Sequence, residues 1–204
     1  MRRPLFLASK NPDKIAEVQA ILGVHQVVLH TMLDFPDFPD TVEDQPSIFG
    51  NAIKKAMEGA RTSGMLSMAD DTGLFIEALG NAPGVFSARY AGDQCSYRDN
   101  IRKVLLQMQD MNNRQAYFET AVALADPTGL ISVVSGRVRG EISKFEEGSN
   151  GFGYDSIFLV EGYFKTYAQM NNEEKNRISH RSLAIKEILP VLQRVLKVNK
   201  DFIQ

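Results

Sequence analysis

Two consecutive carboxylates, Asp70 and Asp71, follow a short apolar run in the segment MLSMADDTG at 65–73. Adjacent anions repel, and a carboxylate near the protein interior is costly unless a hydrogen bond, a cation or a metal ion compensates it. A solvated turn formed with Thr72 and Gly73 is one interpretation of the pair. The other is a magnesium site, because Glu43 in a separate loop adds a third acid and several lysines accompany the acids.

A second stretch with suitable chemistry is the loop SKNPDK, which consists of Ser9, Lys10, Asn11, Pro12, Asp13 and Lys14. It joins the end of a predicted strand to the start of a predicted helix, where free backbone N–H groups and a partial positive charge favour an anion. Lys10 and Lys14 strengthen that interpretation. The loop lacks the GxxxxGK[ST] pattern of a phosphate-binding loop, so an ordinary solvated turn is the alternative.

The sequence predicts alternating strands and helices, and these elements must position the residues named above. A short apolar strand from Pro4 to Ser9 precedes a helix that Asn11 should cap and that should end near Gly23. Ser47 is expected to cap a second helix that ends near Gly64. A strand from Met65 to Ala69 then leads to the two aspartates.

The rest of the chain continues this alternation and predicts an α/β fold. The further expected elements are a strand at His25 to Thr31, a loop at Met32 to Gln45, a helix starting near Ser96, a hairpin of strands Gln115 to Ala125 and Leu130 to Phe145, and a helix from Ser179 to Lys197. Pro190 should kink or split that last helix. The long hairpin indicates that part of the sheet is mixed or antiparallel.

Length and composition exclude several classes of protein. A chain of 204 residues suits one domain with a sizeable core. No apolar run reaches the roughly 18 residues that span a bilayer, and the N-terminus does not read as a signal peptide, so we expect a cytoplasmic protein without a membrane partner. Cys95 is the only cysteine, which excludes an intramolecular disulfide and a thiolate zinc cluster. The net charge of -2 does not favour a nucleic-acid partner.

Six segments, in order over nearly the whole chain, carry a resemblance. They are SKNPDK (9–14), NAIKKA (51–56), ADDTGL (69–74), APGVFSARYAG (82–92), GFGYDSIF (151–158) and EEKNRISHR (173–181). Together they resemble the inosine triphosphate pyrophosphatase family, the dITP/XTP pyrophosphatases that clear deaminated purine nucleotides from the nucleotide pool. Each segment alone is weak, but six in register are specific.

The resemblance implies a fold and a reaction. The implied fold is one domain over 1–204, with a long curved mixed β-sheet, helices on both faces, and two lobes around a central nucleotide-binding cleft. A homodimer is implied as well. The implied reaction is the Mg²⁺-dependent hydrolysis of ITP, dITP and XTP or dXTP to the nucleoside monophosphate and pyrophosphate.

The resemblance also implies roles for single residues. Asp71 resembles the catalytic acid, as proton acceptor and metal ligand, and Glu43 resembles its companion at the magnesium ion. Thr72 would touch the substrate, and Asp70 would support the neighbouring acid or the metal. Because a triphosphate repels a nucleophile, cations must neutralise its oxygens. The candidates for this neutralisation are Lys14, Lys55 and Lys175.

Recognition of the base is expected from the GFGYD and SHR segments. Hypoxanthine and xanthine carry an acceptor oxygen at C6 where adenine carries an amino donor, so fixed donors such as His180 and Arg181 favour the first two bases. Phe152 could stack on the base, or it could belong to the core. His180 could equally be a plain residue at a helix start. The substrate-binding residues expected in the GFGYD segment are Phe152, Gly153, Tyr154 and Asp155.

Two other functions compete with this one. Maf-like nucleotide pyrophosphatases also begin with a strand and an LAS-type loop and act on pyrimidine or modified nucleotides, but they lack the SHR and GFGYD segments. A non-catalytic nucleotide-binding module is the second alternative. An assay of turnover on a panel of nucleotides separates the three.

Overall fold

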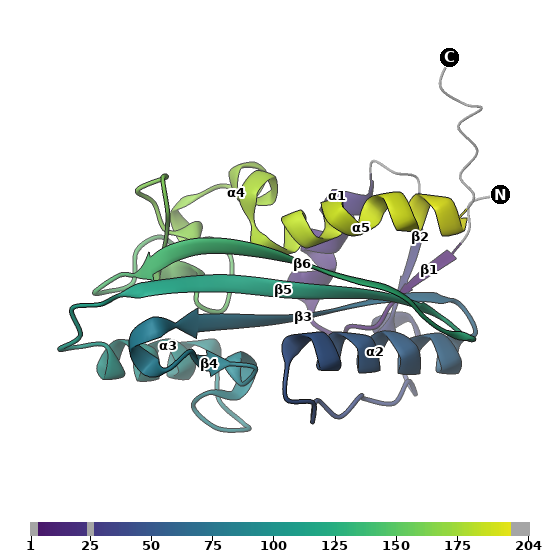
Figure 1. Cartoon of the computed structure of the whole chain (residues 1–204), viewed down its shortest axis with the longest axis horizontal. Coiled ribbons are helices and arrows are strands. Elements are labelled where there is room, and N and C mark those ends of the chain that lie inside the picture. Colours follow the sequence, from purple (N-terminus) through teal and green to yellow (C-terminus); the bar gives the residue numbers. More distant parts are fainter. Residues whose placement is uncertain (1–3, 24–26, 197–204) are drawn as a thin grey trace, which may run out of the picture. The chain divides into compact units, whose positions relative to one another are not determined.

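Strands and helices alternate along the chain, and a computed structural model describes residues 4–23 and 27–196 (Figure 1). The helices are α1 (Pro12–Leu22), α2 (Ile48–Ser63), α3 (Tyr97–Gln107), α4 (Asn172–Ile178) and α5 (His180–Leu196). The strands are β1 (Pro4–Leu7), β2 (Val28–Thr31), β3 (Leu66–Ile76), β4 (Ala82–Gly84), β5 (Gln115–Asp126), β6 (Gly129–Ile142) and β7 (Phe158–Val160). The predicted alternation of strands and helices is confirmed.

The strands of the described residues form one mixed sheet. Its order is β2-β1-β3-β5-β6-β7, and β4 pairs with β3 beside that path. β1 lies parallel to both β2 and β3, with Leu5 opposite Leu29 on one side and Leu66 on the other. The pairs β3–β4 and β6–β7 are antiparallel. The predicted α/β class with a mixed sheet is therefore confirmed.

The chain divides into two compact units. Of the described residues, unit 1 contains 4–23, 27–71, 121–135 and 184–196, and unit 2 contains 72–120 and 136–183. Strands β3, β5 and β6 contribute residues to both units. Each unit has its own hydrophobic core. A single domain with two lobes and a nucleotide-binding cleft stays a prediction.

Helices cover both faces of the strands in unit 1 (Figure 1). α1 and α5 lie on one face, where they share a core with β1, β3 and β5. Its members include Leu5, Leu7, Ile15, Val18, Met68, Leu124, Ile185 and Ile188. α2 lies on the other face and approaches it closely at Gly59, where a Cβ atom would stand only 2.5 Å from Ser67 Oγ. The prediction of helices on both faces is confirmed for this unit.

Local sequence signals set the limits of the helices that carry site residues. Asn11 accepts hydrogen bonds from the backbone N–H groups of Asp13 and Lys14 and so caps α1. Ser47 caps α2, and Gly64 ends it in the left-handed region with φ of 69°. These caps are the predicted ones.

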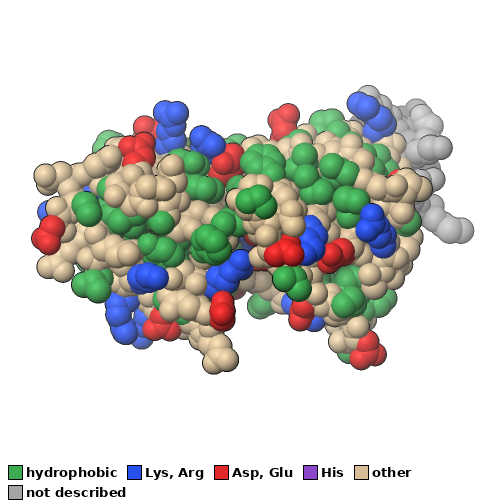
Figure 2. Space-filling model, turned by 60° about the horizontal axis from the view of Figure 1, so that its bottom comes forward, with side chains coloured by type: hydrophobic (Ala, Val, Ile, Leu, Met, Phe, Trp, Pro, Cys, Tyr) green, Lys and Arg blue, Asp and Glu red, His purple; other side chains and the backbone are tan. Residues whose placement is uncertain are grey.

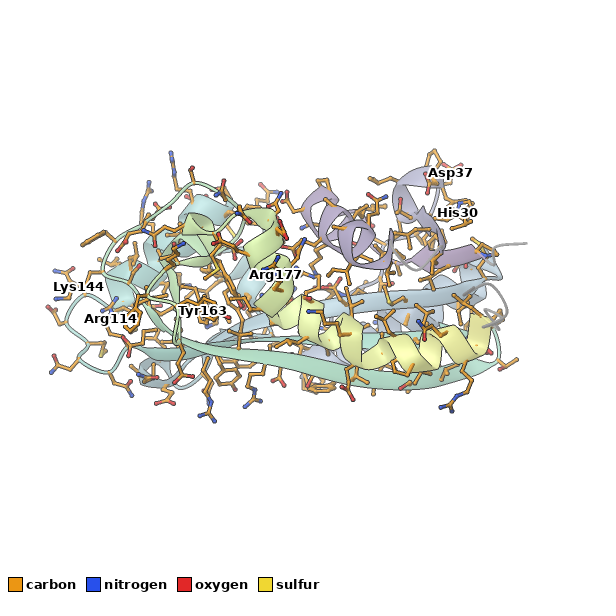
Figure 3. All side chains as sticks on the ribbon, turned by 90° about the horizontal axis from the view of Figure 1, so that it is seen from above. His30, Asp37, Arg114, Lys144, Tyr163 and Arg177 are labelled. Carbon is orange, nitrogen blue, oxygen red and sulfur yellow. The ribbon has the colours of Figure 1, made fainter. Side chains whose placement is uncertain are left out.

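Unit 2 packs α3 and the segments around β7 on a second core. That core includes Leu74, Ile76, Ile101, Val104, Phe118, Tyr154, Phe158 and Tyr167. Arg114, labelled in Figure 3, ties the end of α3 to the end of β6, because its guanidinium donates to the carbonyl oxygens of Met108, Ile142 and Ser143. At the surface of α4, Arg177 pairs with Glu173 at 2.5 Å (Figure 3).

The structure corrects several predicted boundaries. β3 continues through both aspartates to Ile76, whereas the prediction ended the strand at Ala69. Antiparallel pairing with β4 and the burial of Leu74 and Ile76 extend the strand beyond the acids. Pro190 lies inside an unbroken α5, so Pro190 does not split the helix, and the alternative of a kink stays a prediction. The short helix α4 was not predicted. The predicted start of a strand at His25 lies outside the described residues, and β2 begins at Val28.

Charged side chains are mixed on the molecular surface. On the face drawn in Figure 2, basic and acidic side chains of the described residues are interspersed with hydrophobic ones and do not form a basic track. Among the described residues, no helix is long and apolar enough to cross a membrane.

Candidate functional site

The two aspartates are buried in the middle of β3, with 4% of Asp70 and 6% of Asp71 exposed. Successive side chains of a strand point to opposite faces. Asp70 accordingly meets Lys14 of α1, with 3.1 Å between Nζ and Oδ2. Asp71 meets Lys55 of α2, with 3.3 Å between Nζ and Oδ1. The chain therefore tolerates two adjacent buried anions because each has a cation on its own face.

A compact polar cluster surrounds Asp71 in unit 1. The ammonium group of Lys55 donates to Glu43 Oε1 at 2.7 Å as well as to Asp71. The side-chain amide of Asn51 donates to Asp71 Oδ2 at 3.1 Å. Asn51 and Lys55 are four residues apart on α2, so they share one helical face. We call Glu43, Asn51, Lys55 and Asp71 the carboxylate cluster.

Burial and neighbouring charges act in opposite directions on the pKa values in this cluster. Burial raises the pKa of Asp71 and Glu43 raises it further, while Lys55, Lys14 and the Asn51 hydrogen bond lower it, and the net direction is upward. Burial lowers the pKa of Lys55, but Asp71, Glu43 and Asp70 outweigh burial and raise it. Lys55 therefore remains a cation, and Asp71 is a carboxylate with increased affinity for a proton.

The first loop reaches β3 through Lys14, which pairs with Asp70, but its backbone differs from the expected anion site. Asn11 Oδ1 already accepts the N–H groups of Asp13 and Lys14, and Ser9 Oγ accepts that of Asn11. The prediction of free N–H groups at this helix start is wrong for these three residues, because the capping side chains satisfy them. Pro12 has no backbone N–H to offer. Any anion here depends on side chains.

Lys10 is turned toward the loop at 32–45. Its ammonium group donates to the carbonyl oxygen of Phe38 at 3.2 Å and pairs with Asp40 at 2.8 Å. Of the two lysines in the first loop, Lys14 is the one that reaches a buried acid of β3.

The oxygen ligands of the carboxylate cluster fit a magnesium ion. Lys55 places one positive charge between Glu43 and Asp71, which shows that the two carboxylates converge on a common cation position. Within residues 4–23 and 27–196, no three His, Cys, Asp or Glu side chains gather as a complete metal cage. Magnesium commonly takes only one or two carboxylates and completes its shell with water and substrate phosphates. The donor set therefore suits Mg²⁺ bound together with a nucleotide.

In unit 2, a buried ion pair organises the GFGYD loop. Lys175 donates to Asp155 Oδ2 at 2.5 Å, and the same oxygen accepts the backbone N–H of Phe152 at 2.9 Å. Gly151 has φ of 74°, and a Cβ atom there would lie 2.0 Å from Asp155 Oδ2. Only glycine fits at that position. Lys175, expected as a phosphate-neutralising cation, thus lies with the predicted base-reading residues in unit 2.

Two cations flank the Phe152 ring. Lys175 Nζ is 5.0 Å and Arg181 Cζ is 5.7 Å from the ring centroid. Tyr97, the first residue of α3, lies at 5.9 Å from it, ring centre to ring centre. Phe152 is therefore half-buried among polar and aromatic groups. It does not belong to the main core of unit 2.

A chain of side-chain hydrogen bonds holds the SHR segment. Arg181 donates to Thr72 Oγ1 at 3.2 Å, Thr72 and Thr120 are 2.7 Å apart, and Thr120 Oγ1 is 2.6 Å from His180 Nδ1. His180 also stacks on Phe118 with 4.6 Å between ring centres. Because α4 ends at Ile178 and α5 begins at His180, both residues are fixed at a helix junction.

Tyr154 has a structural position. It is 5% exposed within the core of unit 2, and its hydroxyl donates to the Ser87 carbonyl at 2.9 Å. Burial raises the pKa of Tyr154, so the phenol stays protonated. Its side chain therefore anchors the loop, and the expected contact with substrate stays a prediction. Gly153, with φ of 59°, supplies backbone alone to the same loop.

Three neighbours of the predicted residues were missed from the sequence. Asn51 has a detectable signal, because it lies one turn before Lys55 on the same face of α2. Tyr97 directly follows the helix cap Ser96, but nothing in the sequence links it to Phe152. Thr120 sits inside the long apolar run of β5 and gives no signal.

Comparisons with known proteins give matches over nearly the whole chain. The Ham1 family model matches residues 5–191. A dITP/XTP pyrophosphatase of Streptomyces avermitilis is 41% identical over 197 residues, which cover 94% of this chain and 98% of that protein. One of Leuconostoc mesenteroides is 42% identical, with 92% and 96% covered.

Solved structures show the same likeness in three dimensions. The Ham1 protein of Staphylococcus aureus has a TM-score of 0.84 at 36% identity, and 95% of this chain and all of that chain are covered. A HAM1 protein of Coxiella burnetii also has a TM-score of 0.84, at 37% identity with the same coverage. With a match over nearly the full length in sequence and structure, the chain belongs to the Ham1 family.

Proposed function

We propose that this protein hydrolyses dITP, ITP and XTP or dXTP to the nucleoside monophosphate and pyrophosphate. The observation that carries the proposal is the position of Asp71, a buried carboxylate of raised pKa held by Lys55 and Asn51. Relatives of about 40% identity that bear the name dITP/XTP pyrophosphatase support the choice of reaction. The protein is thus a hydrolase of phosphoric anhydrides.

Asp71 is the proposed proton acceptor. It takes a proton from water while the water oxygen bonds to one phosphorus of the α–β anhydride. The bond from that phosphorus to the bridging oxygen breaks, and the bridging oxygen keeps the electron pair, so that the products are the nucleoside monophosphate and pyrophosphate. An acceptor with a raised pKa holds the proton more firmly during this step. Asn51 and Lys55 keep the carboxylate in one orientation, with its two oxygens assigned to different partners.

Lys14, Lys55 and Mg²⁺ are the proposed partners of the phosphates. Glu43 and Asp71 would hold the metal ion, and Asp70 would keep Lys14 in place. When bound, Mg²⁺ neutralises the negative oxygens that repel the attacking water. The phosphates would displace Lys55 from part of its contact with the acids and give this cation a second anionic partner.

The aromatic and arginine residues of unit 2 are the proposed base site. Phe152 offers a ring face, and Arg181 offers N–H donors that Thr72 already orients. A C6 oxygen accepts such a donor, whereas an adenine amino group leaves it unsatisfied. Lys175 holds Asp155, so it acts in this proposal on the base loop and not on the phosphates. Thr72 joins the two groups in sequence, because it follows Asp71 directly.

A substrate panel at fixed Mg²⁺ tests this function. We expect pyrophosphate, and not orthophosphate, to be released from dITP and XTP far faster than from dATP or dTTP. Equal rates on all four would contradict base recognition by Arg181. A preference for dTTP would instead favour a Maf-like activity, and binding without turnover would favour a nucleotide-binding module.

A homodimer and a cytoplasmic location belong to the same proposal. Sedimentation of the purified protein tests the first. Detection in cell fractions tests the second.

A further inference from the structure

Three residues on one face of α2 hold the segment Val42–Gln45, which carries Glu43. The side-chain oxygen Oδ1 of Asn51 accepts the backbone N–H of Gln45 at 3.0 Å. Lys54 Nζ donates to the Val42 carbonyl oxygen and to Asp44 Oδ1, both at 2.8 Å. Lys55 holds Glu43 itself at 2.7 Å. Each residue of the segment thus has a contact with the helix.

Lys54 differs from the other two in what it touches. Asn51 and Lys55 also bind the Asp71 carboxylate, so their loss would alter Asp71 directly. The contacts of Lys54 fall on the residues before and after Glu43. Because one ammonium group donates hydrogen bonds to both neighbours of Glu43, it limits the rotation of the backbone between them.

We propose that Lys54 is a positioning residue, which fixes the backbone around Glu43 and thereby sets that carboxylate beside Lys55 and Asp71. The inference rests on the proposed function for its consequence in turnover, but its structural part does not. Without Lys54, Glu43 keeps its own bond to Lys55 but is carried by a looser segment. Glu43 and Asp71 then spend a smaller fraction of the time in the arrangement in which both face one cation.

Hydrogen exchange of the metal-free protein tests the structural part. Lys54→Met keeps the length of the side chain and removes its charge and its donors. We expect amide exchange of the peptide covering 42–47 to become about tenfold faster. The backbone that carries the N–H groups of Asp44 and Gln45 is then held less firmly, so these groups open to solvent more often. Exchange in 52–60 of α2 should stay unchanged. Unchanged exchange in 42–47 would overturn the proposal.

Magnesium titration of turnover tests the consequence. Lys54→Met should raise the Mg²⁺ concentration for half-maximal rate by about fivefold or more while the rate at saturating Mg²⁺ changes little. Lys54→Arg, which keeps a charged donor, should restore both exchange and the Mg²⁺ requirement to within about twofold of the original protein. A titration curve of Lys54→Met that matches the original would overturn the role in positioning Glu43.

Two control variants separate this effect from general ones. Arg61→Met removes one positive charge from the exposed last turn of the same helix and should change neither readout. Asp44→Asn weakens the ion pair but leaves the bond from Lys54 to the Val42 carbonyl. Its amide exchange rate in 42–47 and its Mg²⁺ requirement should therefore lie between those of the original protein and those of Lys54→Met. Should the original protein not hydrolyse dITP, the proposed function fails, whereas the exchange experiment still decides the role of Lys54.

Discussion

The side-chain amide of Asn51 joins the Asp71 carboxylate to the loop that carries Glu43, since its nitrogen donates to Asp71 Oδ2 at 3.1 Å and its oxygen accepts the Gln45 N–H at 3.0 Å. Asn51 is completely buried. Both ends of one amide therefore act on the carboxylate cluster, one on its central acid and the other on the loop of its second acid.

Asn51→Leu should damage both stability and the pH dependence of turnover. The substitution removes one buried and one partly buried hydrogen bond and takes the amide donor from a buried Asp71 oxygen, at a cost of about 1–3 kcal/mol in the free energy of unfolding. Since the Asn51 bond lowers the pKa of Asp71, its removal should raise that pKa further and move the acidic limb of the rate profile to higher pH. Urea unfolding and a pH profile of kcat measure the two effects. Asn112→Leu, at an exposed position, is the control, and an acidic limb that stays in place would contradict the role given to Asn51.

The limits of the helices could be predicted because they depend on local residues. Ser47 and Gly64 bound α2 through a side-chain cap and a left-handed φ, and both signals are readable in a single chain. Lys55 then follows from its place on the helix. The position of Asn51 on the same face was equally readable, but its partner Asp71 lies on another element.

The surroundings of the two aspartates could not be predicted, because they depend on pairing between distant segments. With the strand predicted to end at Ala69, the sequence left two interpretations of Asp70 and Asp71, a solvated turn or a magnesium site that compensates their repulsion. Continuation of β3 turns them to opposite faces, and Lys14 and Lys55 come from two different helices. The link from Arg181 through Thr72 and Thr120 to His180 likewise joins residues up to 109 positions apart. Because these residues are far apart in the sequence, no local spacing pattern predicts such contacts.

Asp71→Asn should keep the fold and lower turnover by about 10³-fold or more, because the proposed proton acceptor is lost while its shape remains. Its stability should also change with pH in a defined direction. The raised pKa means that the folded protein binds this proton more tightly than the unfolded chain does. Ionisation of Asp71 therefore costs stability as the pH rises from 3.8, the ordinary pKa of an aspartate, through the raised value.

Thermal unfolding in EDTA should accordingly show Asp71→Asn to be more stable than the original protein at neutral pH. The difference should vanish below pH 3.8, where Asp71 is protonated in both states. A variant less stable at neutral pH would mean that the pairing with Lys55 outweighs burial. Retained turnover would place the proton acceptor elsewhere.

Phe164→Gly should stabilise the protein without affecting turnover. Phe164 is 91% exposed and has φ of 52°, so it pays the steric cost of a left-handed conformation and buries little surface in return. Relief of that cost, reduced by the greater freedom of glycine in the unfolded chain, should add about 0.5–1 kcal/mol to the free energy of unfolding. Its exposed neighbour Tyr163 (Figure 3) is not among the residues with positive φ, so Tyr163→Gly should destabilise the protein instead. Equal effects of the two substitutions in urea unfolding would refute strain at Phe164.

Arg181→Lys should reduce the preference for dITP over dATP more than it reduces binding of nucleotides in general. Arg181 is 2% exposed, so truncation to alanine would leave a large cavity and remove one donor from Thr72, whereas lysine keeps the charge and much of the volume. The planar fork of donors is lost, and one missing donor to the C6 oxygen should narrow the ratio of kcat/KM by about tenfold. Thr72→Val serves as the matched change, because it removes the group that orients Arg181 without removing the donors, and should narrow the ratio less. Rates of pyrophosphate release from the two nucleotides give the ratio, and a ratio that Arg181→Lys leaves unchanged would assign recognition of the base to other residues of unit 2.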